Sequence, residues 1–371
     1  MKLTCDREKM LGAFQSAAAV APTRSPKPIL QNVKLDARGE GGVVLATDLE
    51  VGIRVEVPGV SAEAPGSVVL PIQRFGSILR ESGDATLRLE TDGSGVVVRG
   101  EHSEFRLPAE NPAEFPAVSD FSESKYHVVP ARVLSQIIRR TTFATDNESS
   151  RYALGGVLLE LSADKITAVG TDGRRLAMME APAQSVGGHA TGDNMTIVPA
   201  RSMHLIEKIL TEPDAEIHIA ARANEVLVKS PRAMLYSRLV EGRFPKWRDV
   251  FPKRPDAVRI ELSVGPLYSA VRQAMIVTSE ESRGVDFTFG QGNLVLAGRA
   301  PEVGQSRVEL PIAYDGAAVS ISLDPRFFND FLKVLEPEAT FTLELKDAES
   351  AAVCSTSDGY AYVIMPLARD R

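Results

Sequence analysis

The stretch VGTDGRRLA at residues 169–177 and its counterpart ATDLEVGI at residues 46–53 decide how this chain folds. Each stretch follows an apolar run typical of a strand, and each places Thr-Asp where the chain is expected to turn. Because self-similarity at a fixed period is the signature of tandem structural units, the pair indicates an internal duplication with a period of roughly 125 residues.

The duplication extends to three copies of a longer unit. In each copy a short strand enters an amphipathic helix, at residues 3–20, 126–144 and 258–277. A further strand is expected to start at Pro28, Arg151 and Arg283, and a strand that runs into a second helix is expected to start at Ser67, Met195 and Val319. Every copy closes with a strand that is soon followed by proline. The predicted domains are 1–122, 123–253 and 254–371, each large enough to form its own core.

Local signals support these elements. Asp6 is a suitable N-cap for the first helix, and Asp324-Pro325 combines an N-cap with the proline favoured at the first helical position. The predicted linkers, 115–124 and 251–256, are short, which favours a rigid array over independent domains on a string. The sequence therefore predicts an α+β fold of three tandem domains, each with two helices packed on antiparallel sheets.

Length and composition place the chain among soluble globular proteins. It has 371 residues, enough for two or three domains, and its 44% hydrophobic and 25% charged residues are an ordinary balance. The first ten residues reach charges at once, and no run approaches the roughly 20 apolar residues of a membrane helix, so we expect a protein of the cytoplasm with no membrane association. Cys5 and Cys354 are too few and too distant for a disulfide framework or a cysteine-rich zinc site.

The reactive motifs typical of enzymes are missing from the sequence. It contains no Gly-Lys-Ser, Gly-Lys-Thr or Gly-x-Ser-x-Gly, and the glycine clusters at 39–42 and 93–95 fail the dinucleotide fingerprint and are typical of hairpin turns. The histidines are scattered without metal-ligand spacing, and each is expected to be a surface or strand residue: His102, His127, His189, His204 and His218. We therefore predict no catalytic residue, no metal and no cofactor, and hence a protein that is not an enzyme.

Charge is unevenly distributed along the chain. The net charge is −7, whereas the predicted helices are rich in Lys and Arg and poor in acids. The basic helix residues are Arg7, Lys9, Arg74, Arg80, Arg132, Arg139, Arg140, Arg201, Lys208, Arg272, Arg326 and Lys333. Six such helices on one side of a curved sheet would form a basic lining that meets phosphates without reading bases.

At this point several motifs together carry a family likeness. They are Pro28-Ile29-Leu30 after Arg24, Thr47-Asp48-Leu49-Glu50, Arg151-Tyr152 with Leu154, Thr171-Asp172-Gly173-Arg174-Arg175-Leu176-Ala177, Gly242-Arg243-Phe244-Pro245, Arg283-Gly284-Val285 and Tyr362-Val363-Ile364-Met365-Pro366. With these motifs the chain resembles, over essentially its whole length, the bacterial DNA polymerase III beta subunit, the sliding clamp.

The resemblance implies a head-to-tail homodimeric ring of clamp-type domains, with helices lining a hole for double-stranded DNA and sheets forming the outer wall. The implied partners are a second copy of the chain, DNA, the catalytic subunit of the replicative polymerase, the clamp loader and other replication and repair proteins with clamp-binding motifs, all in the bacterial cytoplasm. The implied DNA-contacting residues are Arg24, Arg74, Arg151, Tyr152 and Arg201. Gln73 and Ala153 depart from the residues common in the family.

The resemblance also implies a pocket that takes short apolar peptides from partners. Its residues here are Leu154, Thr171, Gly173, Arg174, Arg175, Leu176, Pro245, Val250, Val363, Met365, Pro366 and Leu367. Aliphatic, proline and methionine walls suit an aliphatic or aromatic anchor, although plain core packing is the ordinary role of a leucine or valine. Asp249 and Ala368 depart from the family pattern beside this pocket. For the dimer interface the resemblance points to Phe105 and Leu107 at one end and to Ile276 and Val277 at the other.

Two other classes are compatible with the residues alone. One is an internally repeated α/β transferase of the enolpyruvyl type, which would need convergent charges at an interdomain cleft. The other is a repeat-built scaffold that binds peptides without DNA. The copies differ most at the turn itself, where the first has Leu49-Glu50 and the third has Ala297-Gly298-Arg299-Ala300, so only 169–177 keeps the pattern that a peptide pocket would need.

Overall fold

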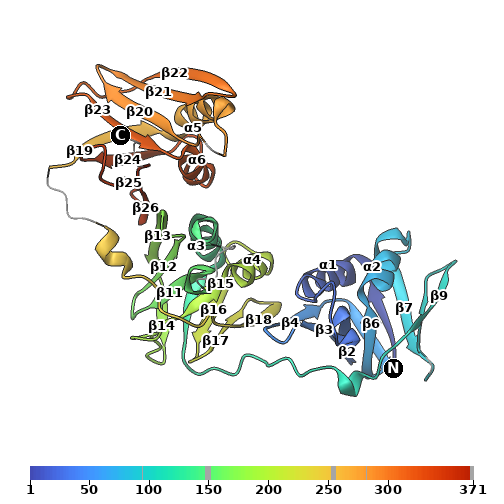
Figure 1. Cartoon of the computed structure of the whole chain (residues 1–371). Helices are drawn as coiled ribbons and strands as arrows, with labels where there is room; N and C mark the ends of the chain where they lie inside the picture. The colour runs from blue at the N-terminus through green and yellow to red at the C-terminus, as the bar shows by residue number, and fades with distance from the viewer. Residues whose placement is uncertain (94, 147–151, 252–255, 281, 368–371) are drawn as a thin grey trace. The chain divides into compact units, whose positions relative to one another are not determined.

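The computed structural model describes residues 1–93, 95–146, 152–251, 256–280 and 282–367 (Figure 1). The chain divides into two compact units. Unit 1 comprises residues 1–135 and 183–239, and unit 2 comprises residues 136–182 and 240–371. The chain passes from unit 1 into unit 2 within helix α3 (Ala131–Thr141).

Unit 1 contains two antiparallel sheets, in the strand orders β5-β1-β7-β8-β9 and β14-β10-β16-β17-β18-β4-β3-β2-β6. The strands are β1 (Lys2–Asp6), β2 (Asn32–Arg38), β3 (Gly41–Thr47), β4 (Val51–Val57), β5 (Val60–Ala64), β6 (Gly66–Pro71), β7 (Thr86–Thr91), β8 (Gly95–Arg99), β9 (Glu104–Pro108), β10 (Tyr126–Pro130), β14 (Gln184–Val186), β15 (Ile197–Pro199), β16 (Glu216–Ala221), β17 (Glu225–Lys229) and β18 (Ala233–Arg238). The helices are α1 (Arg7–Ala18), α2 (Ile72–Glu81) and α4 (Ala200–Lys208), with the 3-10 turns η1 (Pro28–Gln31) and η2 (Pro112–Glu114).

Unit 2 also contains two antiparallel sheets with helices. Its strands are β11 (Gly156–Leu161), β12 (Lys165–Thr171), β13 (Arg175–Pro182), β19 (Val258–Ser263), β20 (Val285–Gly290), β21 (Asn293–Ala300), β22 (Gly304–Pro311), β23 (Val319–Leu323), β24 (Thr340–Leu345), β25 (Ala352–Ser355) and β26 (Tyr360–Ile364). They run side by side in the orders β11-β12-β13-β26-β25-β24-β19 and β22-β21-β20-β23. The helices are α5 (Val264–Ala274) and α6 (Pro325–Lys333), with the 3-10 turns η3 (Thr142–Ala144), η4 (Tyr152–Leu154), η5 (Trp247–Val250) and η6 (Met275–Val277).

Each unit contains one junction at which strands distant in sequence pair edge to edge. In unit 1, β4 pairs with β18 in antiparallel register, with Gly52 opposite Tyr236. In unit 2, β13 pairs with β26, with Leu176 opposite Val363. Because backbone hydrogen bonds cross both junctions, each sheet continues from one sequence repeat into the next without an exposed strand edge.

Helices cover one face of these sheets and close the cores. In unit 1, α1 and α2 lie next to one another (Figure 1). They meet through Phe14 and Phe75, whose ring centroids are 5.1 Å apart in an edge-to-face arrangement. In unit 2, α6 buries Phe331 against Tyr360 and Tyr362, with ring centroids 5.5 Å and 5.2 Å away. The first contact holds α1 against α2, and the second holds α6 on strand β26 of its sheet.

The predicted helix starts and hairpin turns are confirmed. The Asp6 side chain accepts a hydrogen bond from Lys9 N at 3.0 Å, and Asp324 accepts one from Arg326 N at 3.0 Å ahead of Pro325. Gly39 lies between β2 and β3 with φ +55°, and Gly93 lies between β7 and β8 with φ +83°.

Two predicted strand starts are wrong. The segment from Pro28 first forms the 3-10 turn η1, and β2 begins only at Asn32. Pro28 has no N–H for a sheet, and the Asn32 side chain donates to Pro28 O at 3.0 Å and holds the turn. In the segment predicted as a strand from Arg151, Tyr152–Leu154 is also a 3-10 turn and β11 begins at Gly156, while Arg151 itself is outside the described residues.

Candidate functional site

The turn between β12 and β13 is fixed by side chains that bond to their own backbone. Thr171 Oγ1 donates to Arg175 O at 2.6 Å and accepts from Gly173 N at 3.1 Å. Asp172 Oδ1 accepts from Arg174 N at 2.9 Å and Arg175 N at 3.0 Å. Gly173 adopts φ +87°, a conformation that favours glycine, and a Cβ there would meet no atom within 4 Å.

The same bonds recur at the turn between β3 and β4. Thr47 Oγ1 donates to Val51 O at 2.8 Å and accepts from Leu49 N at 2.9 Å, and Asp48 Oδ1 accepts from Glu50 N at 3.0 Å and Val51 N at 2.7 Å. Leu49 keeps the left-handed conformation, with φ +79°, although it is not glycine. The Thr-Asp repeat in the sequence is thus a repeat of hydrogen bonds, which is why the turn is recognisable in both copies.

The third copy has no such turn. The segment from Ala297 to Ala300 lies within strand β21 and pairs with β22. The sequence pattern without Thr-Asp therefore forms a continuous strand, because the side-chain acceptors that reverse the chain are missing.

Arg175 ties the turn in unit 2 to the elements around it. Its guanidinium donates to Asp172 Oδ2 at 3.0 Å, to Asp330 Oδ2 at 2.6 Å and to Phe143 O at 2.8 Å. It also lies over the rings of Phe143 and Phe327, at 5.4 Å and 4.6 Å from their centroids. Its side chain is only 11% exposed, so Arg175 is a structural cation whose donors are used inside the protein.

The phenol of Tyr362 adds to this network. Burial lowers the pKa of Arg175, but the nearby Tyr362, Asp330 and Asp172 oppose this effect and raise it above its ordinary value. Burial also raises the pKa of Tyr362, whose hydroxyl donates to Phe327 O at 3.0 Å. Both groups therefore keep a fixed protonation state at neutral pH.

The end of β26 brings apolar side chains beside this turn. Met365 N donates to Arg174 O at 2.9 Å, which continues the pairing of β13 with β26 by one residue. Leu176 and Val363 are opposite one another in this pairing and are buried, whereas Met365 is 45% exposed. A large apolar side chain beside a rigid turn is typical of a contact surface.

The segment after Gly242 lies against η4. Gly242 has φ +133°, and a Cβ at this position would lie 3.2 Å from Ala153 Cβ. The chain then continues through the exposed Pro245 to η5, which contains the buried Trp247 and the half-buried Val250. Glycine at 242 therefore allows the close approach of this segment to η4.

The residues predicted for the peptide pocket fall into two groups within unit 2. The buried members are Leu154, Thr171, Leu176 and Val363. The exposed or half-buried members are Gly173, Arg174, Arg175, Pro245, Val250, Met365, Pro366 and Leu367. A partner can touch only members of the second group directly, and the first group forms the support beneath them. Within the second group, Arg175 contributes chiefly to this support, because its side chain is only 11% exposed and its donors are bonded inside the protein. Asp249, in η5, is exposed, and Ala368 is outside the described residues.

Two of the residues predicted to contact DNA lie in one region of unit 1. Arg24 and Arg74 are exposed. A hollow of about 570 Å³ lies between the 22–32 loop and the start of α2, and Arg74, Gln73 and Thr23 line it. Both guanidinium groups are therefore available to a phosphate.

The other three residues predicted to contact DNA differ from Arg24 and Arg74, because one is already bonded within the protein and the other two are not fully described. Arg201 is exposed, but it forms an ion pair with Asp48 and donates to Val20 O at 2.9 Å. This arginine therefore connects α4 to the Thr-Asp turn of unit 1, which the sequence did not indicate. Arg151 is outside the described residues, and only the backbone of Tyr152, at the start of η4, is described.

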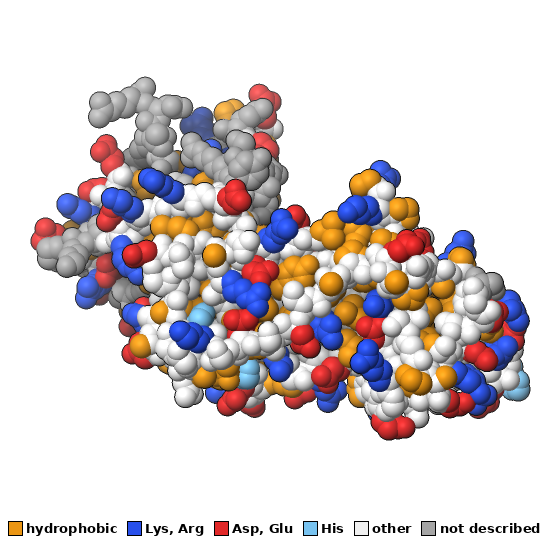
Figure 2. All heavy atoms as spheres, turned by 90° about the horizontal axis from the view of Figure 1, so that it is seen from below, with side chains coloured by type: hydrophobic (Ala, Val, Ile, Leu, Met, Phe, Trp, Pro, Cys, Tyr) orange, Lys and Arg blue, Asp and Glu red, His pale blue; other side chains and the backbone are white. Residues whose placement is uncertain are grey.

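Most of the basic side chains on the helices are exposed. Arg7, Arg140 and Arg326 are exceptions: they are buried or half-buried, and they bond to Leu79 O, Asp358 and Asp324 respectively. The exposed ones are Lys9, Arg74, Arg80, Arg132, Arg139, Arg201, Lys208, Arg272 and Lys333. The face in Figure 2, by contrast, carries acidic and basic side chains interspersed. The exposed helix faces thus carry the excess of positive charge that the sequence predicted.

The predicted dimer residues lie next to sheet edges. Phe105, 39% exposed, is in β9, the edge strand of its sheet, beside Leu107. A hollow of about 450 Å³ lies next to it, lined by Phe105, Ile78 and the 81–84 segment. Ile276, 75% exposed, and Val277 are in η6, next to the edge strand β22.

Two histidines predicted as isolated surface or strand residues form a buried pair. His127 Nδ1 and His189 Nδ1 are 2.7 Å apart, and only His127 lies in a strand. The other ring nitrogen of His189, Nε2, lies next to the backbone of Ala221, 3.1 Å from its N and 3.4 Å from its O. Their separation of 62 residues gave no signal in the sequence.

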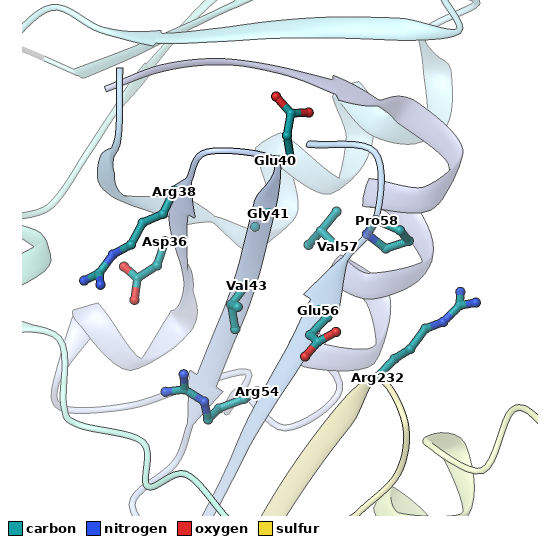
Figure 3. A pocket seen from close by; sticks show the side chains of 11 residues that line it. Asp36, Arg38, Glu40, Gly41, Val43, Arg54, Glu56, Val57, Pro58 and Arg232 are labelled. Atoms are coloured by element: carbon teal, nitrogen blue, oxygen red, sulfur yellow. The ribbon is translucent and has the colours of Figure 1, made fainter. Parts of the chain in front are cut away.

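A further hollow, of about 700 Å³, lies at the ends of β2, β3 and β4 (Figure 3). Its charged lining is mixed in sign: Asp36, Arg38, Glu40, Arg54, Glu56 and Arg232. Arg54 is already engaged there, with Val118 O at 3.3 Å and the Asp120 carboxylate at 3.8 Å. None of the predicted site residues lines this hollow, and its alternating charges select no single class of ligand.

Within the described ranges, no three His, Cys, Asp or Glu side chains are grouped so that they could hold a metal ion. In the same residues, no helix is long and apolar enough to cross a membrane. The candidate site is therefore a surface of apolar and basic groups beside the strand junctions. Together, the fold and this surface define the class of protein: a repeat-built α+β protein with a contact surface.

Comparisons with known proteins agree with this class. Models of the DNA polymerase III beta subunit match the chain in succession: the N-terminal domain at residues 1–119, the central domain at 128–246 and the C-terminal domain at 248–368. The chain is 30% identical to the beta sliding clamp of Chlamydia muridarum over 99% of both chains, and 29% identical to that of Escherichia coli K12 over 99% of this chain and 100% of the relative.

Solved structures of sliding clamps match the chain as well. The sliding clamp of Pseudomonas aeruginosa bound to griselimycin matches with a TM-score of 0.92 and 28% identity over 100% of both chains. The chain belongs to the DNA polymerase III beta subunit family, and it consists of three tandem clamp domains.

Proposed function

We propose that this protein is the sliding clamp of a bacterial replicative DNA polymerase, a ring that encircles duplex DNA and docks the clamp-binding peptides of replication and repair proteins. The observation that carries the proposal is the pair of strand junctions, β4 with β18 and β13 with β26, which make tandem domains into continuous sheets. A wall of continuous sheet suits a mechanical tether, and such a role requires no catalysis.

The domains of this clamp are 1–122, 123–253 and 254–371, and the protein acts in the cytoplasm. Arg24 and Arg74 contact DNA, because both are exposed next to one hollow in unit 1. Contacts to phosphates hold the duplex without fixing its sequence, which is what a sliding protein needs. Arg201 contributes less than these two, because its guanidinium is already paired with the Asp48 carboxylate.

Two copies close head to tail. The edge strand β9 of one copy, with Glu104 and Arg106 exposed, meets the edge strand β22 of the next, with Arg307 and Glu309 exposed. Ile276 enters the hollow beside Phe105, so that both sheet edges and both exposed apolar side chains are covered at once.

Partner peptides bind the exposed apolar residues around Met365 in unit 2. The buried Leu176 and Val363 form the floor, and the Arg175 network holds the adjacent turn rigid. The support for this assignment is that one exposed methionine lies directly beside a turn whose backbone is bonded at four points. The partners are the polymerase catalytic subunit, the clamp loader and repair proteins that carry clamp-binding motifs.

Retention on DNA tests the ring. The protein is loaded by its clamp loader onto a nicked circular plasmid, and the complex is separated from free protein by gel filtration in moderate salt. We expect the protein to stay with the circle and to leave once a restriction enzyme has linearised it. Equal retention on circular and linear DNA would show ordinary binding instead of encirclement. A processivity assay with polymerase and clamp loader then tests DNA, ring and peptide site together.

A further inference from the structure

The turn η5 supplies part of the proposed peptide site but has little stability of its own. Its backbone bonds are local: Trp247 N donates to Pro245 O at 2.7 Å, and Asp249 N donates to Lys246 O at 3.0 Å. No side chain caps its N-terminus. A single 3-10 turn does not persist unless tertiary contacts hold it.

One carboxylate on a neighbouring strand holds this turn. Glu160, on β11, accepts a hydrogen bond from Trp247 Nε1 at 3.2 Å through Oε1. The same carboxylate accepts from Arg248 Nη1 at 3.0 Å through Oε1 and from Arg248 Nη2 at 2.6 Å through Oε2. Two successive residues of η5 are thus bonded to one side chain, and the arginine contact has the fork geometry that makes such pairs specific.

The two residues that bind Glu160 also bind each other. The Arg248 guanidinium lies over the Trp247 ring at 4.1 Å from its centroid, and the Phe251 ring packs against Trp247 with centroids 6.1 Å apart. Trp247 is 8% exposed, although η5 is at the surface. The hydrogen bonds to Glu160 raise the pKa of Arg248, as expected for a cation held by a carboxylate.

This anchor lies between two of the residues proposed to contact partner peptides. Pro245 comes two residues before Trp247, and Val250 comes two residues after Arg248. Glu160 itself is outside this segment, on β11, with its side chain 28% exposed. The positions of Pro245 and Val250 therefore depend on the Glu160 side chain, which is not itself part of the proposed peptide site.

We infer that Glu160 is a positioning residue for partner binding: it anchors η5 through Trp247 and Arg248 and thereby holds Pro245 and Val250 at the peptide site. The inference rests on the proposed function of that site. In this role Glu160, on β11, touches no partner peptide but determines how tightly the peptide binds.

The chain carries its own probe of this anchor, because Trp247 is its single tryptophan. In Glu160→Ala the indole N–H and the guanidinium lose their acceptor, so we expect the emission of Trp247 to shift to longer wavelength. Glu160→Gln keeps an oxygen for the indole N–H but loses the charge that binds Arg248, so its shift should be intermediate. Unchanged emission in Glu160→Ala would overturn the anchor.

Binding is measured with a fluorescein-labelled peptide that carries the clamp-binding motif of the polymerase catalytic subunit from the same organism. We expect Glu160→Ala to weaken its binding about tenfold and Glu160→Gln about threefold, the gradation following the loss of charge-assisted hydrogen bonds. The matched control is Glu344→Ala, which removes another strand carboxylate paired with an arginine, here Arg259 at 2.9 Å. This control should bind the peptide like the unmodified protein.

The outcomes separate the two hypotheses. If the unmodified protein binds the peptide and Glu160→Ala binds it equally well while Trp247 emission shifts, the positioning role is wrong and the peptide site stands. If the unmodified protein does not bind the peptide, the proposed site is wrong and the inference falls with it. Should Glu160→Ala fold poorly, Trp247→Phe replaces it, since it removes the indole donor and keeps a smaller aromatic ring at the position that Arg248 covers, and an affinity equal to that of the unmodified protein counts against the anchor.

Discussion

Replacing Arg175 with methionine should destabilise unit 2 by about 3 kcal/mol. The substitution keeps an unbranched chain of similar length between the Phe143 and Phe327 rings, but it removes the donors to Asp172, Asp330 and Phe143 O. Removing one partner of a buried ion pair costs roughly 3–5 kcal/mol because the other charge is left unpaired. We take the lower end, because the Asp330 side chain is 37% exposed and water can replace part of the lost interaction.

Denaturation by urea, followed through Trp247 fluorescence, measures this loss in unit 2, where Trp247 lies. In a thermal scan the same change corresponds to a decrease in Tm of roughly 6–12 °C for a unit of this size. The control is Arg174→Ala, because Arg174 is exposed and its substitution should change stability by about 0.5 kcal/mol or less. A loss below about 1 kcal/mol in Arg175→Met would refute the view that Arg175 organises the turn.

Three further outcomes are expected. Met365→Ala should weaken binding of a clamp-motif peptide about tenfold in a fluorescence anisotropy titration and leave Tm nearly unchanged, since Met365 is 45% exposed; unaltered affinity would contradict the site. Ile276→Asp should convert dimers to monomers in analytical ultracentrifugation at micromolar concentration, because burial of one such side chain is worth about 2 kcal/mol; a persistent dimer would place the interface elsewhere. Burial lowers the pKa of His189 below 6.5, so the unfolded chain binds more protons there, and the stability present above pH 6.5 should be lost as pH falls through the folded-state pKa. Thermal denaturation at pH 7.5 and pH 5.5 measures this, and the difference should shrink in His189→Gln.

The sequence by itself determined the repeat and the elements within it. Thr171-Asp172 and Thr47-Asp48 encode their turns through bonds to backbone groups at most four residues away, and Asp6 and Asp324 cap their helices in the same local way. Such interactions depend on residue type and short spacing, which is what a sequence displays. The excess of exposed basic side chains on the helices followed from amphipathic spacing for the same reason.

Tertiary structure alone decided which side chains are available and which are engaged. Arg174 and Arg175 are neighbours in one motif, yet the first is exposed and the second bonds to Asp330, 155 residues away. Arg201 could not be recognised from the sequence as the partner of Asp48, nor could His127 and His189 be recognised as a pair. These contacts form where strands or loops distant in the chain are brought together, and no local spacing records them. The folded chain therefore determines which basic and apolar residues of each repeat remain free to meet DNA or a partner.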